Sequence, residues 1–483
     1  MLGALWWLSC LPEAWRFQRA AERVQMTQKA YLGGLWQRNQ NCDYFRSHGL
    51  KRAEDFREKL PLVTYGDLEE WIERCAGGRQ NVLCSEPIQL FEPTSGTQAV
   101  KLIPYTASLK AEFQRGLGAW IGDLYGGKPA LMSGRAYWSI TPPSRWGCPQ
   151  RTAGGIPIGF EDDAAYLSGW SQHLVRGLLA VPRASDLDET ITQLLHCPDL
   201  KLVSVWSPTF WLLLLERLRS HWDHWASLPG LRERMSRGPR ELWPELRLLS
   251  CWADGPSVRF LPALRADFPN LFIQPKGLLA TEAFISFPLL GRRGAALSVR
   301  SHFFEFLGED GREVLAHELV AGRSYEVVVS TGGGLYRYRL GDRVRVTGFY
   351  KECPLVRFLG RSGLVSDHFG EKLTPEAIEL WLPTRRGPCF VAFEDGGYVL
   401  YAEGDLSQAL REGEESLLFY YHYRLCRQLG QLKPLRGFQI ADKAWEAFYT
   451  RLESLGRRRG EVKPLALRLE EDWSHHLPGR WVH

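Results

Sequence analysis

The chain has 483 residues, of which 45% are apolar and 24% are charged, and its formal net charge is only +5. This composition is typical of a folded protein, and the length predicts a large domain with at least one smaller one. So small a net charge gives no support for a nucleic-acid binder. The ten cysteines form no Cys-x-x-Cys pair, which favours free thiols in a reducing cytosol over a disulfide framework.

Two apolar runs, at 2–11 and 210–215, are too short to span a bilayer. The first run also lacks a basic leading region, so it is a poor secretory signal. The second is followed at once by Glu216 and Arg217, which fits a buried helix. We therefore expect a cytoplasmic protein that does not enter a membrane, and we expect it to be a monomer.

The first elements are recognisable from spacing and capping residues. Residues 15–40 have helical spacing, and a second helix is predicted to begin at Thr64, because Asp67 three residues later gives a capping box. A strand at 88–91 leads into a turn-rich segment. After that segment, a helix is predicted over roughly 108–125.

From about residue 200 onward, strands and helices alternate, which predicts β-α-β units and a mostly parallel sheet covered on both faces. The predicted strands lie at 201–206, 246–252 and 271–274, and the predicted helices at 209–219 and 258–267. Between about 298 and 359, short alternating strands with glycine-rich turns predict antiparallel additions.

A domain boundary is predicted near Gly360. The residues beyond it have the pattern of a compact α/β domain of their own. The elements expected there are a helix at 375–382, strands at 389–394 and 398–402, a helix at 407–429, a strand at 435–440 and a helix at 441–456. The fold class is therefore α/β, with a large multi-sheet domain at 1–360 and a small α/β domain at 361–483.

The run Ser330–Asp342 reads Ser-Thr-Gly-Gly-Gly-Leu-Tyr-Arg-Tyr-Arg-Leu-Gly-Asp. Alternating residues around Tyr336 predict a strand that ends at Gly341, which would hold the Asp342 carboxylate on a turn at a sheet edge. A rigidly placed carboxylate can accept two hydrogen bonds from the paired hydroxyls of a ribose. The run is therefore a candidate nucleotide site.

A hydroxyl- and glycine-rich turn lies between a predicted strand and a helix. Its sequence, Thr94-Ser95-Gly96-Thr97-Gln98-Ala99-Val100-Lys101, offers backbone N–H groups, hydroxyls and one cation to phosphate oxygens. It does not match the Walker-type loop. A solvent-exposed turn is the alternative interpretation.

Three further segments carry candidate site residues. Asp254-Gly255 and Thr281-Glu282 each follow a predicted strand, at the edge where open α/β sheets bind ligands. Glu282 could bind Mg²⁺ that bridges phosphates, or it could be a helix-capping or surface acid. Lys463, followed by Pro464, could reach into a neighbouring site or could simply be solvated.

Taken together, these elements resemble the acyl-acid amido synthetases of the auxin-responsive family, within the adenylate-forming superfamily that includes acyl-CoA ligases and firefly luciferase. The supporting residues run from about Asp55 to Arg468. They include Pro61-Leu62-Val63-Thr64-Tyr65, the segment 94–106, Gly154–Gly159, Trp243-Pro244, Asp254-Gly255, Ala280-Thr281-Glu282, Tyr336–Asp342, Gly360-Arg361 and Gly370-Glu371-Lys372. Their shared order and spacing make the match specific.

The resemblance implies ATP and Mg²⁺ as cofactors and a role for each matching residue. The phosphates would be held by Thr94, Ser95, Gly96, Thr97 and Lys101, the α-phosphate and Mg²⁺ by Thr281 and Glu282, the ribose by Asp342, and the nucleotide also by Arg361, Asp254 and Gly255. Lys463 matches the mobile catalytic lysine of the small domain. The phosphate loop departs from the family pattern, since it lacks the second Thr-Gly and the Pro before Lys101.

The implied reaction joins a carboxylic acid to an amine, with an amino acid as the expected acceptor, through an acyl-adenylate. An acyl-CoA or other thioester ligase and a degenerate, non-catalytic binding protein are the alternatives. Arg115 on the helix at 108–125 could pair with the carboxylate of the acid, and Tyr137 could line its pocket. The aromatic residues Phe113, Trp120, Tyr137 and Trp138 could equally be core residues.

Overall fold

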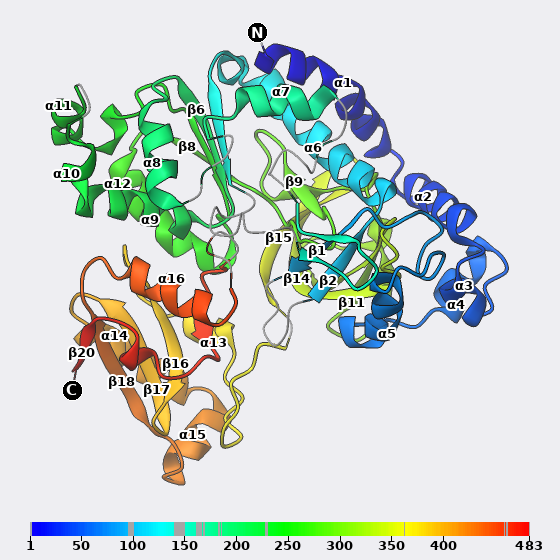
Figure 1. Ribbon diagram of the computed structural model, residues 1–483. Coiled ribbons are helices and arrows are strands. Elements are labelled where there is room, and N and C mark those ends of the chain that lie inside the picture. Colours follow the sequence, from blue (N-terminus) through cyan, green and yellow to red (C-terminus); the bar gives the residue numbers. More distant parts are fainter. Residues whose placement is uncertain are drawn as a thin grey trace. The chain divides into compact units, whose positions relative to one another are not determined.

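The computed structural model (Figure 1) describes the chain in two compact units. The described residues are 2–94, 101–139, 150–160, 167, 170–181, 184, 186–227, 230–361, 363–457, 459 and 462–482. The first unit comprises Met1–Ser204 with Gln274–Ser362, and the second comprises Val205–Ile273 with Gly363–His483. The predicted boundary near Gly360 lies close to the end of the first unit. The grouping of 205–273 with the C-terminal residues is a feature that the sequence analysis did not predict.

Helices of the first unit come mainly from its N-terminal part. They are α1 (Leu2–Ala20), α2 (Val24–Asn39), α3 (Asp43–Ser47), α4 (Phe56–Lys59), α5 (Tyr65–Ala76), α6 (Ala107–Gly127), α7 (Trp170–Leu178) and α8 (Leu187–Leu195). The helix predicted over 108–125 is confirmed as α6. The helix predicted to begin at Thr64 is confirmed as α5, because Thr64 is its N-cap and the backbone N–H of Thr64 donates to Asp67 at 2.7 Å.

Most strands of the first unit belong to two sheets. Two other strands are β3 (Arg135–Ser139) and β6 (Leu200–Val205), and β6 crosses the boundary between the units at Ser204. A four-stranded sheet has the order β2-β1-β5-β4. Its strands are β1 (Leu90–Thr94), β2 (Lys101–Tyr105), β4 (Gln150–Arg151) and β5 (Pro157–Ile158). A seven-stranded sheet has the order β12-β11-β13-β14-β15-β10-β9. Its strands are β9 (Ser286–Pro288), β10 (Ala295–Leu297), β11 (Phe303–Gly308), β12 (Glu313–Leu315), β13 (Ser324–Ser330), β14 (Tyr338–Tyr350) and β15 (Cys353–Arg361).

The seven-stranded sheet confirms the antiparallel additions predicted over 298–359. Neighbouring strands from β9 to β15 pair antiparallel throughout. Strand β14 lies inside the sheet, between β13 and β15, so both of its edges are hydrogen-bonded. This position matters for the candidate site, because β14 carries Asp342.

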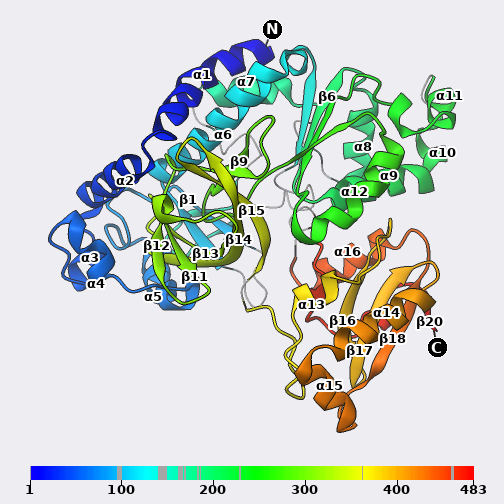
Figure 2. The same ribbon diagram turned by 180° about the vertical axis from the view of Figure 1, so that it is seen from behind.

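Helix α1 lies beside α6 and α7 in both views (Figures 1 and 2). The α1–α6 packing requires a glycine at position 122, since a Cβ there would stand 2.5 Å from the Cβ of Ala14. The indole N–H of Trp7 donates to the Gly122 carbonyl at 3.2 Å. The N-terminal apolar run is therefore a packed helix of the first unit. Within the described residues, no helix is both long enough and apolar enough to span a bilayer.

The second unit combines two stretches of the chain. Its first stretch contains α9 (Pro208–Ser220), α10 (Trp222–Trp225), α11 (Leu231–Ser236), β7 (Leu248–Cys251), the 3₁₀ helix η6 (Gly255–Phe260) and α12 (Leu261–Asp267). The boundary strand β8 (Phe272–Pro275) follows. Strands β6, β7 and β8 therefore confirm the positions of the three strands predicted between 201 and 274.

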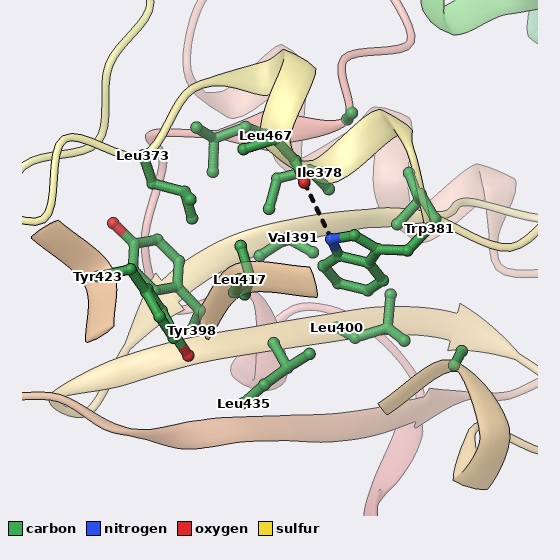
Figure 3. Close-up of a cluster of buried hydrophobic side chains, with 14 of the residues drawn as sticks. Leu373, Ile378, Trp381, Val391, Tyr398, Leu400, Leu417, Tyr423, Leu435 and Leu467 are labelled. Atoms are coloured by element: carbon green, nitrogen blue, oxygen red, sulfur yellow. Dashed lines mark hydrogen bonds between the residues drawn. The ribbon is translucent and has the colours of Figure 1, made fainter. Parts of the chain in front are cut away.

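The C-terminal stretch is an α/β structure built on the five-stranded sheet β19-β16-β17-β18-β20. Its elements are α13 (Pro375–Glu379), β16 (Phe390–Glu394), β17 (Gly397–Glu403), α14 (Ser407–Leu418), α15 (Tyr421–Gln428), β18 (Lys433–Ile440), α16 (Trp445–Ser454), β19 (Leu467–Arg468) and β20 (Gly479–Val482). Trp381, Tyr398, Leu400 and Leu417 belong to its buried core, in which the Trp381 indole donates to the Ala377 carbonyl at 3.0 Å (Figure 3).

The single helix predicted over 407–429 is wrong, because the chain forms α14 and α15 with an extended residue, Tyr420, just before α15. Tertiary hydrogen bonds explain the break. The Glu414 carboxylate accepts from the Tyr423 hydroxyl at 2.8 Å, from Arg427 at 2.7 Å and from the Leu435 N–H at 2.8 Å. The first two bonds require α15 to turn back towards α14, and they override the helical propensity of the intervening residues.

The nine cysteines of the described part of the chain are free and buried. This observation agrees with the expectation of reduced thiols. Burial also raises the pKa of several of these thiols, to about 11 for Cys42 and about 12 for Cys10. They are therefore protonated core residues at neutral pH.

A buried ion pair ties the N-terminal helices to the seven-stranded sheet. Arg337 is 3% exposed and Glu305 is 1% exposed. The Arg337 Nε–H donates to Glu305 at 3.1 Å, and its Nη1 donates to the carbonyls of Arg57 at 2.9 Å and Leu60 at 2.6 Å. Because Arg337 has a φ of +49°, this network also holds a backbone conformation that is unfavourable for a non-glycine residue.

We predict that Glu305→Gln destabilises the protein by about 3 kcal/mol, because it removes the buried carboxylate that pairs with both Arg337 and Arg57 and leaves only the part-exposed Glu313 to balance Arg337. Glu309→Gln is the matched control, since its partner Arg343 is at 2.9 Å but the Glu309 side chain is 70% exposed. That change should cost less than about 1 kcal/mol. Urea unfolding followed by tryptophan fluorescence measures both, and equal midpoints for the two variants would contradict the prediction.

Candidate functional site

Asp342 lies within strand β14, which corrects the prediction that it sits on a turn at a sheet edge. It pairs with Arg361 of β15 across the ladder, and its side chain is almost fully buried. The Arg361 Nε lies 3.4 Å from the Asp342 Oδ1. Gly341 has a φ of +73°, a left-handed conformation that glycine adopts at little cost. The expected turn is thus a local irregularity inside a continuous strand.

Thr281 and Glu282 form the tip of a tight turn. Ala280 and Ala283 exchange both backbone hydrogen bonds, at 3.0 and 3.2 Å, which leaves the two residues between them as a two-residue loop. The Thr281 carbonyl accepts from the Tyr105 hydroxyl of β2 at 2.6 Å. The Glu282 side chain is 6% exposed. Strand β2 therefore anchors the turn that presents this carboxylate.

The charged side chains of Lys101 on β2, Glu282 on this turn, and Asp342 and Arg361 on the β14–β15 ladder interact electrostatically. Burial lowers the pKa of Lys101, while the negative charge of Glu282 opposes the shift and Arg361 adds to it. Burial raises the pKa of Tyr338 far above its usual range, and Glu282 and Asp342 raise it further while Arg361 opposes them. Glu282, Asp342 and Arg361, from distant parts of the sequence, thus lie near Tyr338. Lys101 in turn lies near Glu282 and Arg361.

The predicted phosphate loop is described only at its two ends. Ser95, Gly96 and Thr97 lie outside the described residues, whereas Thr94 ends β1 and Lys101 begins β2 directly opposite it. The loop therefore joins two antiparallel strands, and the prediction that it joins a strand to a helix is wrong. Helix α6 begins only after β2.

Tyr65 fixes the position of Lys101. The N–H of Leu102 donates to the Tyr65 hydroxyl at 2.9 Å, and the Lys101 Nζ lies 5.5 Å from the centre of the Tyr65 ring. Tyr65 is the first residue of α5, so the capped start of that helix sets the geometry at the end of the loop.

A buried network supports the Glu282 turn from behind, and the sequence analysis missed it. The Phe284 N–H donates to His302 Nε2 at 2.9 Å, and His302 Nδ1 lies 3.1 Å from the Glu112 carboxylate. Because Nε2 accepts, the ring proton is at Nδ1 and is donated to Glu112. Tyr31 donates to the same carboxylate at 2.6 Å. A glutamate among the apolar positions of α6 was the sequence signal for this network.

The residues of the first unit fit ATP with a magnesium ion. In the described part of the chain, no group of three or more His, Cys, Asp or Glu side chains could hold a metal by itself. Mg²⁺ that is bound with a nucleotide needs only one or two carboxylates, since phosphate oxygens and water supply the other ligands. The buried carboxylate of Glu282, beside the cation Lys101, matches that donor set.

Three predicted site residues, Asp254, Gly255 and Lys463, belong to the second unit. The Lys463 Nζ lies 5.9 Å from the centre of the Trp252 ring. Asp254 is the N-cap residue of η6, and Gly255, the first residue of η6, has a φ of +54°. Since Trp252 precedes Asp254 by two residues, the predicted catalytic lysine and the Asp254-Gly255 segment lie in the same part of this unit.

The predicted acyl-binding residues make contacts that belong to the protein interior. Arg115 donates to the Arg300 carbonyl at 3.1 Å. Tyr137 is a buried residue of β3. The Trp120 indole donates to Gln274 at 3.0 Å, and the rings of Trp138 and Trp6 are 5.3 Å apart. These contacts favour the core interpretation of the tryptophans, and a role of Arg115 or Tyr137 in acyl binding stays a prediction.

Comparison with known proteins gives relatives along most of the chain. Rice GH3.10 (Oryza sativa subsp. japonica), provisionally named an indole-3-acetic acid-amido synthetase, is 27% identical over 72% of this chain and 80% of its own length. Indole-3-acetic acid-amido synthetase GH3.15 of Arabidopsis thaliana is 24% identical over 71% of this chain and 69% of its own.

Solved structures share the fold. The AtGH3.15 acyl acid amido synthetase in complex with 2,4-DB matches with a TM-score of 0.82 at 20% identity, over 97% of this chain and 96% of that one. A 2-hydroxyisobutyryl-CoA ligase in complex with 2-HIB-AMP matches with a TM-score of 0.53 at 14% identity, over 90% and 93% of the two chains. The fold is therefore the mixed α/β fold of these enzymes.

Family models match two long segments of the sequence. The GH3 family N-terminal domain matches residues 14–227, and the GH3 family central domain matches residues 295–361. Together they cover more than half of the sequence, and the chain belongs to the GH3 family.

Proposed function

We propose that this protein is an ATP-dependent ligase that adenylates a carboxylic acid and transfers the acyl group to an amine, with an amino acid as the acceptor. The observation that carries the proposal is the meeting of Lys101, Glu282, Asp342 and Arg361 in the first unit. The names of its relatives support the same reaction class. The proposed setting is the cytoplasm, and the proposed active form is a monomer.

A carboxylate needs activation because it is a poor electrophile: its charge repels nucleophiles, and oxide is a poor leaving group. Attack of the acid on the α-phosphorus of ATP forms an acyl-adenylate and releases pyrophosphate. The amine then attacks the acyl carbon, and AMP leaves with the bonding electron pair. The first step thus replaces oxide with AMP as the leaving group, and the second step uses AMP as the leaving group when the amide bond forms.

In this proposal each residue has a distinct task. Asp342 accepts hydrogen bonds from the ribose hydroxyls, and the Arg361 guanidinium lies beside its carboxylate. Lys101 and the loop N–H groups attract the phosphates, and Thr281 and Glu282 stand at the α-phosphate. Mg²⁺ bound at Glu282 supplies positive charge that offsets the charge on the phosphate oxygens.

Lys463 is the proposed catalytic cation for the first step. We propose that residues 361–483 form a mobile domain that brings Lys463 to the α-phosphate and later withdraws it, so that the amine can enter. A movement of this kind would also keep water from the adenylate between the two steps. The thioester ligase alternative shares the first step, and the fold shared with a CoA ligase keeps it open.

An ATP–pyrophosphate exchange screen tests the proposed function directly. The panel holds aryl and alkyl carboxylic acids, including indole-3-acetic acid and 2,4-DB. We expect exchange with at least one acid, and AMP release that then depends on an added amino acid and not on CoA. Dependence on CoA would favour the thioester ligase. Binding of ATP with Mg²⁺ but no exchange with any acid would favour the non-catalytic relative.

We predict that Lys463→Ala slows adenylate formation about 100-fold or more, the typical effect of losing one group that stabilises transition-state charge. The reaction of pre-formed acyl-adenylate with the amine should keep its rate, because the lysine acts only in the first step. Lys433→Ala removes a surface lysine of the same unit, paired with Asp395 at 2.9 Å, and is the control. Equal losses in both half-reactions of Lys463→Ala would contradict the assignment.

Lys101 should make ATP binding sensitive to alkaline pH. Burial lowers its pKa, so the ammonium loses its charge at a lower pH than an ordinary lysine does. The KM for ATP should therefore rise roughly tenfold through the alkaline range, the effect of losing one charge-assisted hydrogen bond. In Lys101→Arg the side chain stays charged, and the KM should stay flat over this range. The same alkaline rise in Lys101→Arg would contradict the prediction.

A further inference from the structure

Two arginines hold the backbone on the C-terminal side of Lys463. The Arg468 Nη2 donates to the Lys463 carbonyl at 3.3 Å. The Arg259 Nη2 donates to the carbonyls of Pro464 at 2.9 Å and Leu465 at 3.1 Å. Three successive carbonyls are thus bound by two guanidinium groups.

The two arginines come from different stretches of the second unit. Arg468 belongs to β19, five residues after Lys463, and its guanidinium carbon lies 4.7 Å from the ring centre of Phe448 and 5.5 Å from that of Trp473. Arg468 is therefore fixed within the C-terminal stretch. Arg259 belongs to η6 of the stretch 205–273. The hydrogen bond from Arg468 to Lys463 lies within the C-terminal stretch, so it does not depend on where that stretch packs. The hydrogen bonds from Arg259 form only while the C-terminal stretch packs on residues 205–273.

The contact between the two stretches has polar and incompletely packed parts. A cavity at this contact is lined by Arg259 and Arg468, together with Cys389, Phe390 and Phe448. Among the described residues, the Nε–H groups of Arg259 and Arg468 are buried without a hydrogen-bond partner. A permanent core normally pairs such donors. These unpaired groups are more typical of a surface that docks and separates.

Other contacts across the same surface are also separable. The Thr209 and Tyr449 hydroxyls are 2.7 Å apart, and the rings of Phe260 and Trp445 are 5.7 Å apart. On the rim, Arg386 forms an ion pair with Asp267. These contacts hold the C-terminal stretch against 205–273, but none of them involves residues 463–465.

We propose that Arg259 is a positioning residue that fixes the backbone beside Lys463 for the adenylate-forming step. Its two hydrogen bonds form when the C-terminal stretch docks on 205–273, and they break when that stretch moves away. This inference rests on the proposed function, since it assigns a purpose to the orientation of Lys463. Pro464 contributes as well, because the residue before a proline is restricted to extended conformations.

Arg259→Gln and Arg259→Lys test the inference, with Arg386→Gln as the matched control. Glutamine removes the charge, and its shorter side chain ends in a single NH2 group in place of the guanidinium. Lysine keeps the charge but loses the planar fork of donors. Arg386→Gln removes a charged contact between the same two stretches, but one that does not involve the Lys463 loop. All variants are measured as the full chain, and thermal unfolding checks that each one is folded.

We expect Arg259→Gln to lower the kcat of ATP–pyrophosphate exchange at least tenfold, with an intermediate loss for Arg259→Lys and a change within twofold for Arg386→Gln. The KM for ATP should change little, and pre-formed acyl-adenylate should react with the amine at the wild-type rate. A merely structural role would lower both half-reactions together, and that result would overturn the inference.

Exchange by a folded Arg259→Gln within twofold of wild type would also overturn it. If the wild-type chain catalyses no exchange with any acid, the proposed function fails and the inference fails with it. Wild-type exchange with no effect of the Arg259 variants leaves the proposed function in place and removes only the role of Arg259.

Discussion

The first unit depends on the pairing of buried carboxylates with cations. A carboxylate that loses its water is unfavourable unless positive charge or hydrogen bonds replace that water. Asp342 and Glu282 are both nearly fully buried, and the cations near them are Arg361 and Lys101. The groups reach one another only if strand β2, the turn at 280–283 and the β14–β15 ladder lie together. The charge balance of the proposed nucleotide site therefore also constrains the fold.

The same principle operates away from the site. Buried Arg337 pairs with Glu305 and Glu313. Glu112 accepts hydrogen bonds from His302 and Tyr31 next to the Glu282 turn. The His302–Glu112 network also binds the backbone N–H of Phe284, two residues after Glu282. The buried core of the first unit therefore holds the backbone next to the proposed phosphate site. Such support is what keeps a buried acid in a fixed position.

Local signals in the sequence predicted local structure well. The capping box at Thr64 and the length of α6 are confirmed, as are the antiparallel strands after residue 298 and the strands β16 and β17. The prediction for Asp342 was wrong in its setting because glycine and aspartate usually mark a turn, whereas here Gly341 bends a strand that continues. Strands β13 and β15 flank β14 in the sequence as well as in the sheet, so Asp342 could be recognised as internal only if β14 was known to continue past Gly341.

Predictions that depend on long-range contacts were the least accurate. The break between α14 and α15 follows from hydrogen bonds of Glu414 to two other elements, α15 and β18, and the sequence around 419 gives little sign of it. Likewise, residues 205–273 group with the C-terminal residues through packing between segments about 200 residues apart. The hydrogen bonds from Arg259 to the carbonyls of Pro464 and Leu465 depend on the same packing. The resemblance to a known family supplied candidate site residues, but not the groups that hold them in place.

The central claim is that segments hundreds of residues apart bind one molecule of ATP. A crystal structure of the protein with Mg²⁺ and a non-hydrolysable ATP analogue tests this claim most directly. The account predicts the ribose hydroxyls within hydrogen-bonding distance of the Asp342 carboxylate and the α-phosphate beside the Thr281–Glu282 turn. A nucleotide bound elsewhere, with neither residue in contact with it, would contradict the account.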